Sequence, residues 1–355
     1  MQRKIAVAAL LLAALLAGAE GVRAQSAIMT LPRVSQHARV SQRIGITDIT
    51  IDYSRPLVKG RKVFGTLEPY GKVWRAGANE NSTIEFSDNV TVEGQALPKG
   101  VYGLHMIPGE TSWAVIFSKN STSWGSFSYD QAEDALRVTV KPRTIENVDA
   151  LTYDFADPAA TSVVVTMEWE KVAVPFKVEV NTPEVVQASL RNQLRARPQY
   201  EWQSWDEAAT FLLDNKLSPE DALRYADRSI QLEDRFENEM LKSRALTALG
   251  KKDEALAARD KALSIGTQEQ VQAYARGLQR QGKKEEALEL FRINIKKNPN
   301  SWIAHNELAR IAVAQGDYDT AVKEMKLAVS VAPEPIKGPL GDIVKRLENK
   351  VDINN

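Results

Sequence analysis

The chain has 355 residues, of which 43% are hydrophobic, and its 46 Lys and Arg residues balance its 46 Asp and Glu residues. This length predicts two domains, and the composition is that of a soluble globular protein. A net charge of zero provides no overall field to attract nucleic acid or an anionic membrane, so we expect neither as a partner. The absence of cysteine excludes disulfides, thiolate metal sites and cysteine nucleophiles.

Residues 1–24 have the pattern of a secretory signal peptide. A basic pair at residues 3–4 precedes an apolar stretch at residues 5–18, and small or modest side chains at residues 22–24 stand before a cleavage site at Gln25. The apolar stretch is too short to span a bilayer comfortably, and no later segment is apolar enough to do so. We therefore expect a periplasmic or secreted protein with no membrane span.

Residues 28–181 are predicted to form an antiparallel β-sandwich. Apolar and polar residues alternate from about residue 36, in short segments separated by turn residues. Within residues 43–53 the alternation shifts by one position at Thr47, which predicts a β-bulge or two short strands. Residues 94–100 are interpreted as a break. Further strands are expected at residues 83–86, 90–92, 101–107, 113–117, 136–140, 151–155, 163–169 and 172–180.

After Pro183 the pattern becomes helical, and a repeat is visible. Gly250, Gly282 and Gly316 are each followed five residues later by an alanine, and the last two glycines are 34 residues apart. Small alanines let two helices approach, and glycine permits the turn between them. The spacing is typical of tetratricopeptide repeats. We predict a tetratricopeptide-type α-solenoid over residues 202–350, with four helix pairs and an amphipathic helix that covers the last pair.

Signatures of enzymes and metal sites are missing from the sequence. Its three histidines do not have the spacing of paired zinc ligands, and no nucleophile elbow is present. The glycine-rich residues 60–66 end in Thr66, where a phosphate-binding loop requires lysine. We therefore predict no metal, no cofactor and no catalytic residue. An envelope-associated hydrolase of a carbohydrate or similar substrate is the alternative, and it would require Glu80, Glu85 and His105 to meet in one cleft.

The segment 53–80, YSRPLVKGRKVFGTLEPYGKVWRAGANE, holds six of the sixteen Lys and Arg residues between positions 25 and 182. Arginine forks beside aromatic faces suit an anionic or sugar-acid ligand. The same residues could instead hold a long connection against a sheet, with Arg55 and Arg75 half-buried, and both interpretations stay open. His105 is either a satisfied strand residue or part of a pocket. The candidate ligand-binding residues are Arg55, Arg61, Tyr70, Trp74, Arg75, Asn79, Glu80 and His105.

This segment, together with LPKGVYGLHMIP and WAVIFSKN further along the chain, resembles the bacterial family catalogued as domain of unknown function 2911 over about residues 28–175. The repeat-containing part also resembles an arrangement seen in that family. The resemblance implies no established activity and no catalytic residues. We therefore expect a binding or assembly protein, whose helical repeats hold a protein or peptide and whose β module takes a small anionic or sugar ligand or a partner.

Overall fold

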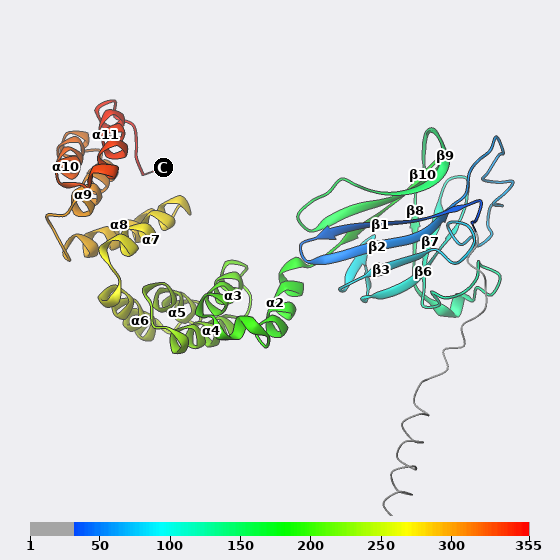
Figure 1. Ribbon diagram of the computed structural model, residues 1–355, viewed down its shortest axis with the longest axis horizontal. Coiled ribbons are helices and arrows are strands. Elements are labelled where there is room, and N and C mark those ends of the chain that lie inside the picture. Colours follow the sequence, from blue (N-terminus) through cyan, green and yellow to red (C-terminus); the bar gives the residue numbers. More distant parts are fainter. Residues whose placement is uncertain (1–31, 355) are drawn as a thin grey trace, which may run out of the picture. The chain divides into compact units, whose positions relative to one another are not determined.

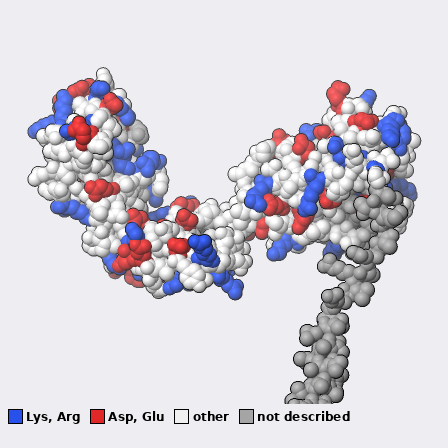
Figure 2. All heavy atoms as spheres, viewed as in Figure 1, with Lys and Arg blue, Asp and Glu red and all other residues white. Residues whose placement is uncertain are grey.

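The structure is a computed structural model that describes residues 32–354, and it divides into two compact units at Val180 and Asn181 (Figure 1). The predicted signal peptide, residues 1–24, lies outside the described residues. Within the described part of the chain, no helix combines the length and the apolar character needed to cross a membrane. Lys and Arg residues are interspersed with Asp and Glu residues over the visible faces of both units (Figure 2).

The N-terminal unit consists of two antiparallel sheets, which confirms the predicted β-sandwich. Strands β1 (Gln36–Ile44), β2 (Thr47–Arg55), β3 (Thr83–Phe86), β6 (Gly100–Ile107), β7 (Trp113–Ser118) and β8 (Asp134–Val140) form a six-stranded sheet in the order β1-β2-β3-β6-β7-β8. Strands β4 (Val90–Val92), β5 (Gln95–Leu97), β9 (Arg143–Ala156) and β10 (Ser162–Glu179) form a four-stranded sheet in the order β5-β4-β10-β9.

The core lies between these two sheets. Phe117 of β7 meets Phe176 of β10 edge to face, with ring centroids 5.8 Å apart. The connection between β2 and β3 adds two aromatic rings to the same core, because Phe64 lies edge-on to Trp113 at 4.7 Å and Trp74 stacks on Trp169 at 5.6 Å. The aromatic residues of the 53–80 segment therefore anchor it by burial.

Three details of the strand prediction need correction. The shift at Thr47 marks two strands rather than a bulge, but they are longer than expected, because nine-residue β1 and β2 form a hairpin that turns at Gly45, which has φ of 58°. Residues 94–100 are not a plain break, since Glu93 and Gly94 both have positive φ and close a two-residue hairpin into β5. The segments expected at 163–169 and 172–180 are one strand, β10, in which irregular pairing around Glu170 absorbs the phase change.

The C-terminal unit contains ten α-helices within the described residues. They are α2 (Thr182–Gln193), α3 (Trp202–Asp214), α4 (Pro219–Leu232), α5 (Phe236–Ala248), α6 (Lys252–Ile265), α7 (Gln268–Arg280), α8 (Lys284–Ile295), α9 (Trp302–Ala314), α10 (Tyr318–Val331) and α11 (Glu334–Glu348). Consecutive helices from α3 to α10 pack as four pairs, as predicted, and α3 also contacts α5 while α7 contacts α9. Phe236 of α5 also meets Tyr274 of α7 edge to face at 5.8 Å, so the first helices of neighbouring pairs contact each other. We call the surface that α3, α5, α7, α9 and α11 form the first-helix face.

The turn inside each helix pair explains the repeated glycines. Gly250, Gly282 and Gly316 have φ between 75° and 78°, a left-handed conformation that costs glycine little. The first pair has Lys216 at the corresponding turn, also with positive φ, so this divergent repeat keeps the turn conformation without glycine.

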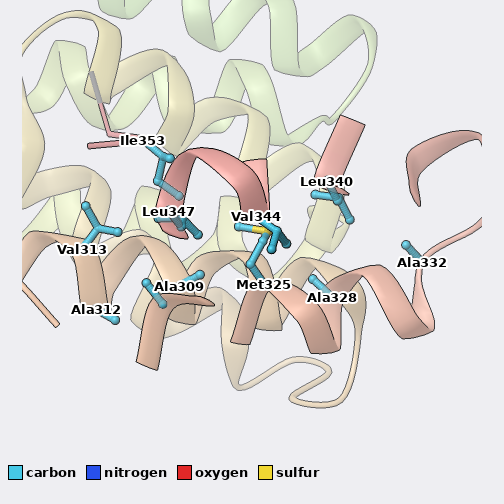
Figure 3. Packing of buried hydrophobic residues seen from close by; sticks show 11 residues of the cluster. Ala309, Ala312, Val313, Met325, Ala328, Ala332, Leu340, Val344, Leu347 and Ile353 are labelled. Atoms are coloured by element: carbon cyan, nitrogen blue, oxygen red, sulfur yellow. The ribbon is translucent and has the colours of Figure 1, made fainter. Parts of the chain in front are cut away.

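Small side chains bring the two helices of a pair together. Ala321 of α10 is fully buried in a cluster with Ala309 of α9, and Leu340, Val344 and Leu347 of α11 pack on the same cluster. Figure 3 shows the α11 residues lying over Met325 and Ala328. Helix α11 therefore covers the last pair, as the sequence predicted.

Candidate functional site

Two of the predicted arginines, Arg55 and Arg61, donate hydrogen bonds to other residues of the β unit. Arg55 ends β2 and reaches β9, where its Nε donates to the carbonyl of Leu151 at 2.8 Å and its Nη2 to Oγ1 of Thr152 at 2.7 Å. Arg61 donates within its own loop, to the carbonyls of Val58 at 3.0 Å and Leu57 at 2.6 Å. Both side chains hold the 53–80 segment in place.

The two predicted aromatic ligand residues differ in exposure. Trp74 is 4% exposed, and its indole N–H donates to the carbonyl of Gly77 at 3.0 Å. It is a core residue. Tyr70 is 42% exposed, but its ring lies against Gly65, where an added Cβ would come within 2.7 Å of the ring. One face of Tyr70 is therefore already covered by the loop that it closes.

The carboxylates that the hydrolase alternative requires each lie near an arginine. Glu80 forms an exposed ion pair with Arg33 at 2.8 Å, and Glu85 lies 3.9 Å from Arg39. The acid whose charge acts on His105 is Asp134. Asn79, the residue before Glu80, is also occupied, because its amide donates to the carbonyl of Ser35 at 3.1 Å.

Arg75 has a different environment from the other predicted arginines. Its Cζ lies 6.0 Å from the ring centroid of Trp124, and its Nη1 lies against Gly125. Its Nε is buried and has no hydrogen-bond partner among the described residues. Burial raises the pKa of the nearby Glu68 carboxyl to about 7, and the charge of Arg75 opposes that rise. Arg75 therefore differs from Arg55 and Arg61, whose Nε atoms donate to backbone carbonyls.

Two exposed aromatic rings lie next to Arg75. Trp124 and Phe127 stack on each other at 6.2 Å, although they are 59% and 84% exposed. Large aromatic side chains exposed as a pair offer a flat apolar face to a ligand or partner. Chemically, this patch can hold a ring or a sugar face on the aromatics and an anionic group on the guanidinium.

His105 is buried beneath residues 119–133, the loop between β7 and β8 that carries Trp124 and Phe127. Its Nδ1 is hydrogen-bonded to Oγ of Ser126 at 2.9 Å, and its ring lies 5.3 Å from that of Tyr129. Burial lowers the pKa of His105 to about 4, and the charge of Asp134 opposes this effect only in part. The histidine is therefore neutral at neutral pH, and its contacts are those of a satisfied core residue.

A polar network that the sequence analysis missed holds this loop. The hydroxyl of Tyr129 donates to Asp134 at 2.8 Å, and Arg137 donates to that hydroxyl at 2.6 Å and to the same carboxylate at 2.9 Å. Burial, together with Asp134, raises the pKa of Tyr129 to about 12. The available signal was in residues 119–133, a stretch between β7 and β8 in which aromatics stand among serines and a glycine.

The helical unit has a groove between its second and third helix pairs. It has a volume of about 560 Å³ and is lined by residues of α5, α6, α7 and α8, with Leu213 of α3. Met240, Leu278 and Leu290 supply an apolar floor. Charged residues at the rim are Arg244, Lys252, Arg259, Lys283, Glu286 and Glu289. An apolar floor with a mixed-charge rim suits the side chain of a bound peptide. The described residues contain no group of His, Asp and Glu placed to hold a metal ion.

Comparison with known proteins distinguishes the two units. No curated protein matches the chain. The crystal structure of MamA is 19% identical to the chain at a TM-score of 0.27, and the match covers 44% of this chain and 92% of MamA. The crystal structure of YrrB, a TPR protein with an unusual peptide-binding site, is 14% identical at a TM-score of 0.25, with coverages of 46% and 84%.

The remaining comparison concerns the β unit. Residues 35–178 match the model of the family described as Protein of unknown function (DUF2911). This range runs from just before β1 to the end of β10 and contains both sheets. It also contains the 53–80 segment, on which the resemblance was based. The resemblance is confirmed, because the N-terminal unit of this chain matches the model of the DUF2911 family.

Proposed function

We propose that this protein is an exported, non-catalytic binding or assembly protein whose helical unit binds a protein or peptide segment. The observation that carries this proposal is the groove of about 560 Å³ between α5 and α8, with its apolar floor and charged rim. A groove of this kind accepts the apolar side chain of a peptide while the rim selects its charged neighbours.

The β unit contributes a second, smaller binding surface in this proposal. Its support is the grouping of Arg75, Trp124 and Phe127, in which a half-buried guanidinium lies beside two exposed, stacked rings. The ligand that fits is a small anionic molecule or a sugar acid, because arginine binds carboxylates with two parallel hydrogen bonds. Export rests on the signal-peptide pattern of residues 1–24.

The helical groove can be tested without knowing its natural partner. A displayed library of random twelve-residue peptides is selected on the full chain, and the enriched peptides are titrated against two variants. Leu256→Asp places a charge at a groove-lining position that is 49% exposed, so the fold is little disturbed. Val331→Asp makes the same kind of change at a position that is 53% exposed and belongs to α10.

We expect Leu256→Asp to weaken the selected peptides by about tenfold or more, because a charge in an apolar contact must be desolvated. Val331→Asp should leave their affinity unchanged. Failure to enrich any peptide, or equal effects of the two substitutions, would contradict the assignment of the groove as the binding site.

A further inference from the structure

The residues that follow α11 fold back onto the helical unit. Helix α11 ends at Glu348, and Lys350 adopts a positive φ of 55° that turns the chain. Residues 351–354 then continue without regular secondary structure, and Ile353 and Asn354 are 4% and 7% exposed. This non-helical stretch, which we call the 351–354 segment, is therefore bound to the surface of its own repeats.

Side chains of α7, α9 and α11, three helices of the first-helix face, donate hydrogen bonds to this segment. Nη1 of Arg310 in α9 donates to the carbonyl of Ile353 at 2.6 Å. Nε2 of Gln279 in α7 donates to Oδ1 of Asn354 at 2.9 Å, and Nδ2 of Asn354 donates to the carbonyl of Arg310 at 2.9 Å. In α11, Nη2 of Arg346 also donates to the carbonyl of Asp352 at 3.3 Å. The segment is thus bound through two backbone carbonyls and one side-chain amide.

The side chain of Ile353 provides an apolar contact between those two polar ones. It belongs to the buried cluster that contains Val313 of α9 and Leu347 of α11. Figure 3 shows it on the side of the cluster where these two residues lie. A backbone acceptor, an aliphatic side chain and an amide, each received by a matching group, are the elements by which a groove recognises a peptide.

The charges around this site favour an acidic peptide. Arg310 is 1% exposed, and burial lowers its pKa to about 9, with further lowering by the charges of Arg276 and Arg346. Asp352 opposes this effect, as does Glu307. Arg276 and Arg310 are 34 residues apart, so they occupy the same position in successive repeats. The bound segment therefore supplies an acid, Asp352, whose charge acts on Arg310 and whose carbonyl accepts from Arg346.

The 351–354 segment both covers and pairs donors of the site. Without it, Nη1 of Arg310 would lose its carbonyl acceptor and the amide of Gln279 would lose its partner. A hydrogen bond from a charged donor such as Arg310 contributes more free energy than one between neutral groups. The free site would therefore favour any segment that supplies the same groups.

We propose that the first-helix face at α7, α9 and α11 binds a non-helical partner peptide. In this peptide an acidic residue is followed by an aliphatic residue and an asparagine. The 351–354 segment occupies the same site as a tethered ligand, and the partner displaces it. The inference rests on the proposed function and specifies a second peptide site on the same unit.

The first experiment is a fluorescence-polarisation titration with a labelled peptide of sequence KVDIN, residues 350–354, whose capped ends carry no charge. It compares the full chain with the double variant Ile353→Ala/Asn354→Ala. A tethered segment competes at a local concentration on the order of millimolar. We therefore expect the double variant to bind the peptide about tenfold more tightly, or better, than the parent. Val351→Ala, at a position 42% exposed, is the matched control and should behave as the parent does.

Two further changes test which residue of the site contacts the peptide and which residue of the peptide the site recognises. Adding Gln279→Leu to the double variant removes the donor to the asparagine and should weaken binding about fivefold. The peptide KVNIN, which lacks the acid, should bind about threefold less tightly than KVDIN. Equal affinity of the parent and the double variant, or no effect of Gln279→Leu, would overturn the proposal.

A measurement on the unmodified chain covers the case in which the double variant does not fold. The amide N–H of Asn354 donates to the Asp352 carboxylate at 2.8 Å. Excess KVDIN should speed hydrogen exchange in residues 351–354 because it displaces them, and unchanged exchange would contradict the proposal. Leu256→Asp should not alter the KVDIN titration, so failure of the α5–α8 groove and failure of this site give different results.

Discussion

Arginine serves opposite purposes in the basic 53–80 segment and on the first-helix face. Arg55 and Arg61 stand out in the sequence, yet their donors go to β9 and to the carbonyls of their own loop, where they hold the segment in place. Arg310 lies in an ordinary-looking repeat, yet it binds the carbonyl of Ile353 in the non-helical 351–354 segment. The comparison teaches that a dense run of basic residues does not identify a binding site.

The largest expected effect concerns Arg310. Arg310→Ala removes a buried cation that donates to Asn306 and to Ile353, and it leaves those acceptors unpaired. We expect a loss of about 3–5 kcal/mol in the free energy of unfolding, measured by urea denaturation. Arg280→Ala, at an exposed position on α7, is the control and should change stability by less than about 0.5 kcal/mol. Similar losses of unfolding free energy in Arg310→Ala and Arg280→Ala would contradict the role given to the hydrogen bonds of Arg310.

The second prediction concerns pH and tests whether His105 is a core residue. Its pKa in the folded state is lowered to about 4 by burial. The unfolded chain therefore binds more protons than the folded one between about pH 4 and pH 6.5, and the free energy of unfolding falls as pH is lowered through this range. The contribution of His105 to this fall is up to about 3 kcal/mol.

The variant His105→Gln isolates this contribution. Glutamine keeps a hydrogen-bonding group beside Ser126 but does not titrate. Glu68 acts in the opposite direction, because its raised pKa makes the folded state bind the extra proton up to about pH 7. The quantity to measure is therefore the difference between parent and variant in urea denaturation at pH 4.5 and pH 7. His37→Gln, at an exposed position, serves as control, and an equal pH dependence in parent and His105→Gln would show that His105 is not buried as described.

The smallest expected effects separate Arg55 from Arg75. Arg55→Lys loses the two hydrogen bonds to Leu151 and Thr152 and should cost about 1–2 kcal/mol of stability. Arg75→Lys should change the free energy of unfolding by less than about 0.5 kcal/mol, because Arg75 Nε has no partner to lose. Thermal unfolding of both variants beside the parent makes the comparison. A greater loss of stability from Arg75→Lys than from Arg55→Lys would show that Arg75, and not Arg55, has the structural role.

Local pattern was enough to predict much of the fold. Period-two alternation predicted most strands, and the repeated glycines predicted the turns of the helix pairs, because both depend on residues close together in sequence. The continuity of β10 could not be predicted in this way. It pairs with β9 and with β4, and Val178 lies opposite Val92, so its length depends on partners far away in the chain.

The candidate sites also divide into features that local sequence predicts and features that depend on distant residues. The sequence by itself determined a β module with a basic, aromatic segment and a helical-repeat unit, because side-chain alternation and repeat spacing are local properties. Only the tertiary structure decided that Arg55 is used by β9, that a loop buries His105, and that Ile353 lies against Arg310. Each of these outcomes depends on which distant donor, acceptor or apolar surface the fold brings into contact, and pairing at that range leaves no signal in neighbouring residues.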